Sequence, residues 1–322
     1  MAGQTINGKA FEYACLESVA RLLKDSRVDF RIDMTPSYNT AKSFFDGLTP
    51  PQKERYLLAA NTATKTIAGL EPQLLNGKGR VILDIQPDSA AVGPNGDVRD
   101  VLFMRKETKE PWEVGISCKH NHEALKHPRI TESKDFGLEW IDVPCSTKFI
   151  DEITPITDEM DLLGSRKTLW NTVPNKFDRF YVPILNAYLK EIQRLCNSHK
   201  DIPEKLLSYF FGVNDFYKII MKESQKTTTV EGFNMHGTLN VSVNRIKPTM
   251  KVPVIHMPKR LLNAEFKEKS KTTIILTFDN GWSISMRLHN KDKEVSPTSL
   301  AWDVKLVGLP PSTYVNTRSW YD

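Results

Sequence analysis

The chain has 322 residues and a mass of 36.7 kDa, with 40% hydrophobic and 26% charged residues. A chain of this length and composition can bury a full hydrophobic core, which excludes collagen-like, low-complexity and wholly disordered proteins. No apolar run approaches the roughly 20 residues that a membrane helix needs, and the N-terminus has no signal-peptide core. We therefore expect a globular, cytoplasmic protein with no membrane partner.

The net charge of +5 is concentrated in the last third of the chain. Basic and acidic residues balance at 27 each over residues 1–200, but number 17 and 12 over residues 201–322. Within residues 241–271 the counts are 8 and 2. A basic segment of this kind suits a polyanion, because each neutralised phosphate releases condensed counterions. A solvated lysine-rich surface is an equally good interpretation of the charge alone.

The cysteines are far apart and form no CxxC pair, so the sequence indicates neither a disulfide framework nor a zinc ribbon. A zinc site formed by Cys118, His120 and His122 is disfavoured, because no second Cys/His pair follows at a suitable spacing. The sequence also contains no P-loop, and we expect no nucleotide cofactor.

In chain order, the sequence predicts a helix over residues 7–25, opened by Asn7, and a second over residues 50–69 with prolines in its first turn. Three short β-branched or alternating segments then predict strands, at residues 81–85, 98–105 and 112–119. The residues 93–96 between the first two of these strands form a strong turn signal.

Residues from about 146 to 222 return to the helical period of 3.6, and Pro183 is expected to start or kink a helix there. The β pattern resumes after residue 226. Strands at 272–278 and 282–288 are joined by Asp279-Asn280-Gly281, which is a hairpin signature, and a further strand lies near 302–307.

Asp100 and Lys119 are the first candidates for catalysis. If strands 98–105 and 112–119 form a hairpin centred between Lys109 and Glu110, Asp100 lies opposite Lys119. Directly opposed side chains share a face, with Cβ atoms about 4.5–5.5 Å apart. A carboxylate that holds Mg²⁺ beside a lysine that orients or deprotonates water suits phosphodiester hydrolysis. A purely structural Asp–Lys pair is the alternative that the spacing leaves open.

Glu12 is the second unusual carboxylate, because it falls inside the apolar arc of the helix at 7–25. A carboxylate in an apolar environment is costly unless it is paired. A metal ion or a lysine would serve as its partner, and a gap in the packing that reaches solvent is the alternative.

Three ordered motifs resemble one nuclease superfamily. The Gly8-x-x-Phe11-Glu12 helix, the strand opening with Asp100-Val-Leu-Phe and the strand ending in Ser117-Cys118-Lys119 are similar to the PD-(D/E)xK superfamily in its type II restriction endonuclease form. The segments at 117–129, 143–149, 212–220 and 233–240 further resemble restriction enzymes of the HaeIII type, which cut the palindrome GGCC.

This resemblance implies an α/β fold with a restriction-endonuclease-like mixed β-sheet core flanked by helices. It also implies Mg²⁺-dependent cleavage of double-stranded DNA by a homodimer, with Asp100 and Glu12 as metal ligands and Lys119 as the catalytic lysine. We expect residues 1–225 to form the nuclease core with a helical insertion, and residues 226–322 to form a basic, β-rich DNA-recognition subdomain.

One position departs from the superfamily pattern, which has an acid two residues before the lysine, where this chain has Ser117. Glu12 is the first candidate for the missing ligand, and Glu123 or Glu132 is the second. Asp97 is held in reserve for Asp100.

The expected DNA contacts follow the catalytic strand and continue in the basic segment. Arginines can bind guanine through O6 and N7, so Arg245 and Arg260 are the expected base readers and the lysines the expected phosphate contacts. The full set of expected DNA contacts is His120, Asn121, His122, Arg129, Arg245, Lys247, Lys259 and Arg260.

Two other functions remain open at this point. The chain could be a non-catalytic, sequence-specific DNA-binding protein in which Asp100 and Lys119 form a structural pair. It could also be a nuclease of the same fold that acts on RNA or on branched or damaged DNA.

Overall fold

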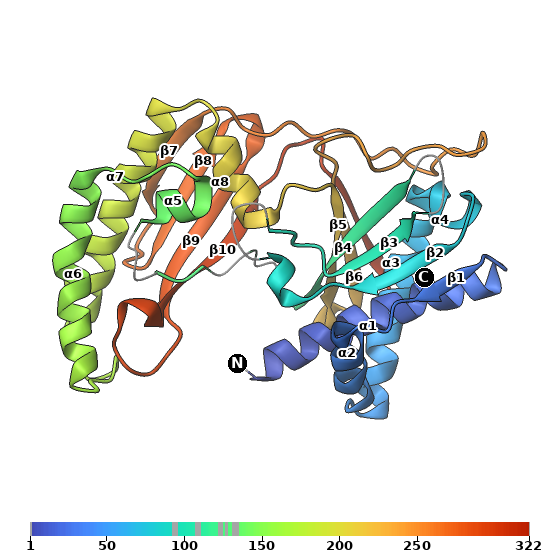
Figure 1. The fold of residues 1–322 in the computed structure, drawn as a ribbon, viewed down its shortest axis with the longest axis horizontal. Coiled ribbons are helices and arrows are strands. Elements are labelled where there is room, and N and C mark those ends of the chain that lie inside the picture. Colours follow the sequence, from blue (N-terminus) through green and yellow to red (C-terminus); the bar gives the residue numbers. More distant parts are fainter. Residues whose placement is uncertain are drawn as a thin grey trace.

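The computed structural model describes residues 2–91, 96–106, 111–121, 125, 128–130 and 135–321. These residues form two lobes, each with one β-sheet and its own hydrophobic core (Figure 1). None of the described helices is long and apolar enough to cross a membrane.

The first lobe contains a seven-stranded mixed sheet in the order β1-β2-β3-β4-β5-β6-β11. Its strands are β1 (Phe30–Ile32), β2 (Val81–Ile85), β3 (Val101–Arg105), β4 (Trp112–His120), β5 (Phe216–Lys222), β6 (Thr227–Phe233) and β11 (Tyr314–Ser319). The β1-β2 and β4-β5 pairs are parallel, and the other pairs are antiparallel.

Four helices belong to this lobe: α1 (Ala2–Asp25), α2 (Pro36–Asp46), α3 (Pro50–Leu70) and α4 (Pro72–Asn76). The apolar sides of α1 and α3 pack on one face of the sheet, and residues such as Val114, Ile116 and Tyr217 complete that core from the strands. Side chains alternate between the two faces of a strand, so the intervening residues of β4 and β5 point to the opposite face.

The second lobe contains a four-stranded antiparallel sheet in the order β10-β9-β8-β7. Its strands are β7 (Leu261–Phe266), β8 (Thr273–Phe278), β9 (Ser283–Asn290) and β10 (Leu300–Gly308). The helices α5 (Phe136–Ile141), α6 (Thr147–Ser165), α7 (Val182–Ser198) and α8 (Ile202–Phe211) lie with this sheet. Aromatic rings join them, for example Tyr188 and Trp302, whose centroids are 4.9 Å apart.

Several predicted elements are confirmed, among them α3, β2 and the β8-β9 hairpin. Asn280 and Gly281 in that hairpin have φ of 59° and 87°, the left-handed region that Asn and Gly tolerate best. Pro183 lies in the first turn of α7, as expected. The predicted turn at 93–96 lies largely outside the described residues.

Two element predictions are wrong. Helix α1 begins at Ala2 rather than at Asn7, so Asn7 lies inside the helix and does not cap it. The helical period assigned up to residue 222 is wrong from Phe216 onward, where the chain forms strand β5. The side chains of β5 are buried on both faces, and a largely apolar run without strict alternation cannot be distinguished from a buried helix by periodicity.

The two sheets divide the C-terminal part of the chain. Strands β6 and β11 belong to the seven-stranded sheet, whereas β7 to β10 form the second sheet and pack with α5 to α8. The sheets therefore do not separate at residue 225/226. The predicted boundary between a nuclease core and a DNA-recognition subdomain stays a prediction.

Candidate active site

Asp100 immediately precedes β3, and its N–H donates a hydrogen bond to the Ile116 carbonyl (2.8 Å). Val101 pairs with Ile116, so Asp100 lies beside Ser117, and the predicted pairing of Asp100 with Lys119 is wrong by two residues. A shift of two residues keeps every side chain on its face. The Nζ of Lys119 consequently lies 3.7 Å from Oδ2 of Asp100.

The Asp100 carboxylate lies at the end of the sheet where β3 begins and where β4 continues to His120. Its Oδ2 accepts hydrogen bonds from the Cys118 N–H (2.6 Å) and the Ser117 hydroxyl (3.2 Å). Among the described residues these contacts and the Lys119 ion pair all use Oδ2, which leaves Oδ1 available to a cation.

Glu12 approaches the same carboxylate from α1 and is 5% exposed. Burial, followed by the negative charge of Asp100, raises the pKa of Glu12 to about 8, although Lys9 and Lys119 act in the opposite direction. The Nζ of Lys9 lies 2.9 Å from Glu12 Oε2 and 2.6 Å from Asp88 Oδ1. Lys9 was not predicted from the sequence, although its position three residues before Glu12 on a helix is a usable signal.

Glu12 and Asp100 are the two carboxylates here that could hold a divalent cation. Both offer anionic oxygens, which hard cations such as Mg²⁺ prefer, and a cation near both would relieve their mutual repulsion. Within the described part of the chain, no group of three or more potential metal-ligating side chains is present. Glu123 and Glu132, the second candidates for the missing ligand, lie outside the described residues.

A cavity of about 200 Å³ opens in front of Asp100 at the junction of the lobes. The large sheet and the segment before β3 contribute Val98, Asp100, Ser117, Lys119, Phe216 and Lys218 to its lining. Phe210 and Phe211 of α8 close it from the second lobe, and Ala91 and Leu125 complete it. The cavity thus combines charged groups with apolar walls.

Comparison with known proteins assigns the family. The sequence model of the HaeIII restriction endonuclease family matches residues 8–310. The type II restriction enzyme HaeIII of Haemophilus aegyptius is 34% identical over 315 residues, which cover 98% of this chain and 97% of that enzyme. No solved structure matches the chain.

The chain belongs to the HaeIII restriction endonuclease family. It is therefore a type II restriction endonuclease, a site-specific deoxyribonuclease with DNA as its partner. The predicted family is confirmed, and so is the predicted α/β class with a mixed sheet flanked by helices.

Asp97, the reserve candidate, has a different place in this restriction endonuclease. Its carboxylate binds the Arg99 guanidinium through contacts of 2.6–3.0 Å and accepts a hydrogen bond from Asn214 (3.2 Å). Arg99 in turn lies over Gly115, where an added Cβ would come within 2.1 Å of its Cδ. Asp97 therefore holds Arg99 against β4 instead of facing Lys119.

The residues after Lys119 do not all face the active site. His120 lies on the opposite face of β4, stacked on Tyr56 with ring centroids 5.2 Å apart and 3.3 Å from Glu223. His120 and Lys119 therefore point to opposite faces, because successive strand residues alternate, and the contact of His120 with DNA stays a prediction. Burial also lowers its pKa. His122 lies outside the described residues.

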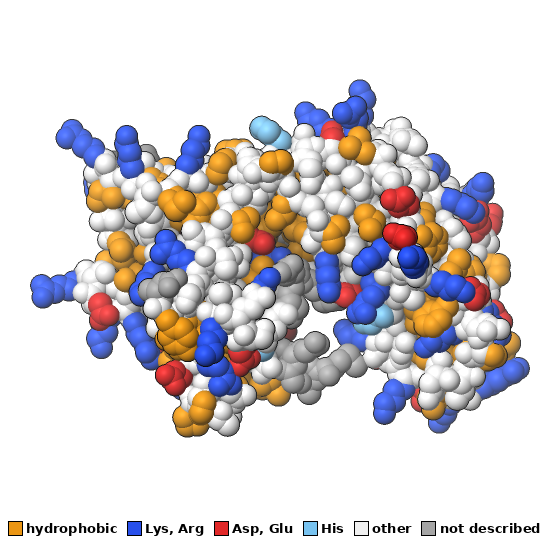
Figure 2. Space-filling model, turned by 180° about the vertical axis from the view of Figure 1, so that it is seen from behind, with side chains coloured by type: hydrophobic (Ala, Val, Ile, Leu, Met, Phe, Trp, Pro, Cys, Tyr) orange, Lys and Arg blue, Asp and Glu red, His pale blue; other side chains and the backbone are white. Residues whose placement is uncertain are grey.

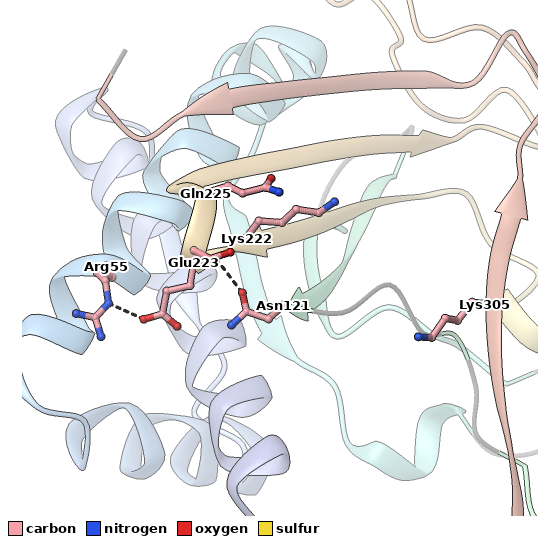
Figure 3. Close-up of a pocket in the computed structure, with 7 residues that line it drawn as sticks. Arg55, Asn121, Lys222, Glu223, Gln225 and Lys305 are labelled. Atoms are coloured by element: carbon pink, nitrogen blue, oxygen red, sulfur yellow. Dashed lines mark hydrogen bonds and ion pairs between the residues drawn. The ribbon is translucent and has the colours of Figure 1, made fainter. Parts of the chain in front are cut away.

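Asn121 lines a separate open cleft of about 870 Å³ (Figure 3). The first lobe contributes Arg55, Lys222, Glu223, Ser224 and Gln225, and Lys305 of β10 faces them from the second lobe. Arg55 binds Glu223 (2.6 Å), and the Asn121 side-chain carbonyl accepts the Glu223 N–H (2.8 Å). The cleft begins two residues beyond Lys119, and its cations were not predicted from the sequence.

The expected DNA contacts of the basic segment are spread over both lobes. Asn244, next to Arg245, hydrogen-bonds to the Asn76 carbonyl beside α4, whereas the N–H groups of Lys259 and Arg260 donate to Asp279 in the β8-β9 turn. The four cationic side chains of this segment expected to contact DNA are exposed: Arg245, Lys247, Lys259 and Arg260.

Arg129 is engaged within the second lobe, where its guanidinium binds Asp292 (2.6 Å) and the Thr298 carbonyl (2.7 Å). Seen from behind, the molecule is notched between the lobes, with Lys and Arg side chains along the edge of the notch (Figure 2).

Proposed function

We propose that this restriction endonuclease makes Mg²⁺-dependent double-strand cuts at the palindrome GGCC, with Asp100, Glu12 and Lys119 as its active site. The observation that supports this most is the contact of Lys119 Nζ with Asp100 Oδ2 at 3.7 Å, in the cavity at the lobe junction. The sequence GGCC follows from the likeness to HaeIII-type enzymes.

Asp100 and Glu12 would hold the Mg²⁺ ion, which when bound supplies positive charge to the phosphate under attack. The Lys119 ammonium, fixed beside Asp100, orients the attacking water and stabilises the charge that develops on the phosphate oxygens. The water oxygen bonds to phosphorus as the bond from phosphorus to O3′ breaks. The products carry a 5′-phosphate and a 3′-hydroxyl, and the apolar walls of the cavity limit competing water.

We further propose that DNA lies across the junction of the lobes, between the active-site cavity and the cleft formed by Lys222 and Lys305. A homodimer suits this substrate, because a two-fold axis between subunits matches the two-fold axis of a palindrome. We place the enzyme in the cytoplasm, in keeping with its free cysteines.

The direct test incubates the purified protein with plasmid DNA and Mg²⁺. We expect discrete fragments that are absent when EDTA is added, and sequencing of their ends identifies the recognition site and the cut position. An intact plasmid that shifts in a gel would support the non-catalytic DNA-binding protein. Cleavage confined to RNA or to branched or damaged DNA would support the other nuclease.

A further inference from the structure

A second lysine lies at the centre of the catalytic face of the sheet. Lys218 of β5 pairs with Ser117 of β4 on one side and with Glu231 of β6 on the other. Because paired residues share a face, Asp100, Ser117, Lys218 and Glu231 form one row across four adjacent segments. Lys218 is 2% exposed and lines the same cavity as Asp100 and Lys119.

The two strand neighbours of Lys218 in this row carry one negative charge between them, on Glu231. Ser117 is neutral, and its hydroxyl donates to Asp100, so it supplies no negative charge to the neighbouring Lys218. The Nζ of Lys218 lies 3.6 Å from Glu231 Oε2, a longer contact than a tight charged hydrogen bond. Lys119 and Lys218 thus bring two ammonium groups to a cavity of about 200 Å³ that also holds Asp100.

The burial of Lys218 beside the cavity, and not a missing partner, is the feature that a structural role alone does not require. Burying an ion pair costs several kcal/mol per ion in desolvation, and well-packed apolar residues commonly serve as well. The same strand contributes apolar residues to both faces of the sheet, including Phe216 on the face of Lys218. A buried ammonium that borders a cavity is better explained by a ligand with negative charge.

We propose that Lys218 is a second catalytic lysine, which donates a hydrogen bond to a non-bridging oxygen of the scissile phosphate, and that Glu231 positions it. This inference rests on the proposed function, because it takes the cavity to be the site of phosphodiester cleavage. Lys119 and Lys218 approach the phosphate from neighbouring strands. Ser117, which pairs with Lys218, is neutral and so does not compete with the phosphate for the Lys218 ammonium.

The test measures single-turnover cleavage in Mg²⁺ and binding in Ca²⁺, on a duplex that carries the site mapped by plasmid cleavage. Lys218→Met, which keeps the length of the side chain without its charge, is expected to lower the cleavage rate about 100-fold or more. Its binding in Ca²⁺ should stay near that of the wild type, and Lys218→Arg should recover part of the rate. Lys200→Met, in the exposed turn between α7 and α8, is the control.

A phosphorothioate at the scissile phosphate identifies the contact. Sulfur in place of the oxygen bound by Lys218 should slow the wild type and have no such effect on Lys218→Met. The double variant Lys218→Met/Glu231→Gln removes both buried charges and keeps the test valid if the single variant is unstable.

Wild-type cleavage by Lys218→Met, or the same sulfur effect in the double variant as in the wild type, overturns the inference while the proposed function stands. A wild type that fails to cut any plasmid overturns the proposed function, and this inference with it.

Discussion

Asp100 and Lys119 carry the chemistry in our proposal, and their replacement separates catalysis from binding. Asp100→Asn can still accept the Cys118 N–H but supplies no negative charge, and Lys119→Ala removes the ammonium. Each is expected to lower the single-turnover rate on the order of 10³-fold or more. DNA binding in Ca²⁺ and the melting temperature should change little. Cleavage at the wild-type rate by either variant would remove the proposed active site.

Replacement of Glu12 tests whether this residue is a metal ligand in place of the acid that is missing at Ser117. Because the fold already disfavours its negative charge, Glu12→Gln should cost little thermal stability. If Glu12 binds the metal, the Mg²⁺ concentration for half-maximal cleavage should rise about tenfold or more, and the maximal rate should fall. Glu17→Gln on the same helix is the matched control, since its partner is Arg21. An unchanged Mg²⁺ titration would point instead to Glu123 or Glu132.

At the scale of elements, the sequence predicted which face of the sheet Asp100 and Lys119 share, but not which residue lies opposite Asp100. The register of β3 and β4 was wrong by two residues, because the turn centre cannot be located from composition, yet a period of two left Asp100 and Lys119 together. The same period placed His120 on the opposite face, which the sequence interpretation overlooked. Lys218 was missed because β5 resembled a helix, and Glu231 of β6 was missed with it because its cross-strand partner is Lys218.

Glu71 joins α3 and α4 to the sheet through a buried carboxylate. Its Oε1 accepts hydrogen bonds from the Tyr217 hydroxyl and the Asn240 N–H, both at 2.7 Å. Burial nevertheless raises the pKa of Glu71 from its ordinary 4.5 to about 7. The folded state therefore binds this proton more tightly than the unfolded state. This contribution to stability is complete below pH 4.5 and is lost as the pH rises through 7, a change of roughly 3 kcal/mol.

We expect urea unfolding to show a larger loss of stability between pH 5 and pH 8 in the wild type than in Glu71→Gln, because the variant has no proton to lose. The difference between the two pH dependences is the measurement, since other groups titrate in both proteins. Glu204→Gln, an exposed position on α8, should keep the wild-type dependence. Equal dependences in the wild type and Glu71→Gln would show that Glu71 has a similar pKa in both states.

At the scale of the whole molecule, the local periodicity of the sequence could not predict which helices and strands pack together in each lobe. The helices α5 to α8 share a core with β7 to β10, which begin 50 residues after the end of α8, and β11 returns to pair with β6. Such long-range packing has no periodic signal in the sequence. It nevertheless creates the active-site cavity, since Phe210 and Phe211 of one lobe face Asp100 of the other.

The arrangement of the lobes also separates two cationic surfaces that could bind DNA. Lys222 and Lys305 line the cleft between the lobes, whereas Lys259 and Lys267 are exposed in the basic segment. Each phosphate contact contributes about 0.9 to the slope of log affinity against log salt. Lys305→Ala is therefore expected to make the slope shallower by about 1, and Lys259→Ala/Lys267→Ala by about 2.

The measurement is fluorescence anisotropy of a labelled duplex in Ca²⁺ over a range of KCl concentrations, with Lys200→Ala as the control. If Lys305→Ala alone changes the slope, DNA follows the cleft and the basic segment is a solvated surface. If the Lys259 and Lys267 variant alone changes it, DNA crosses the β8-β9 turn instead. A change in both would require a duplex that extends from the cleft across the second lobe, because Lys305 lies on β10 whereas Lys259 and Lys267 flank β7.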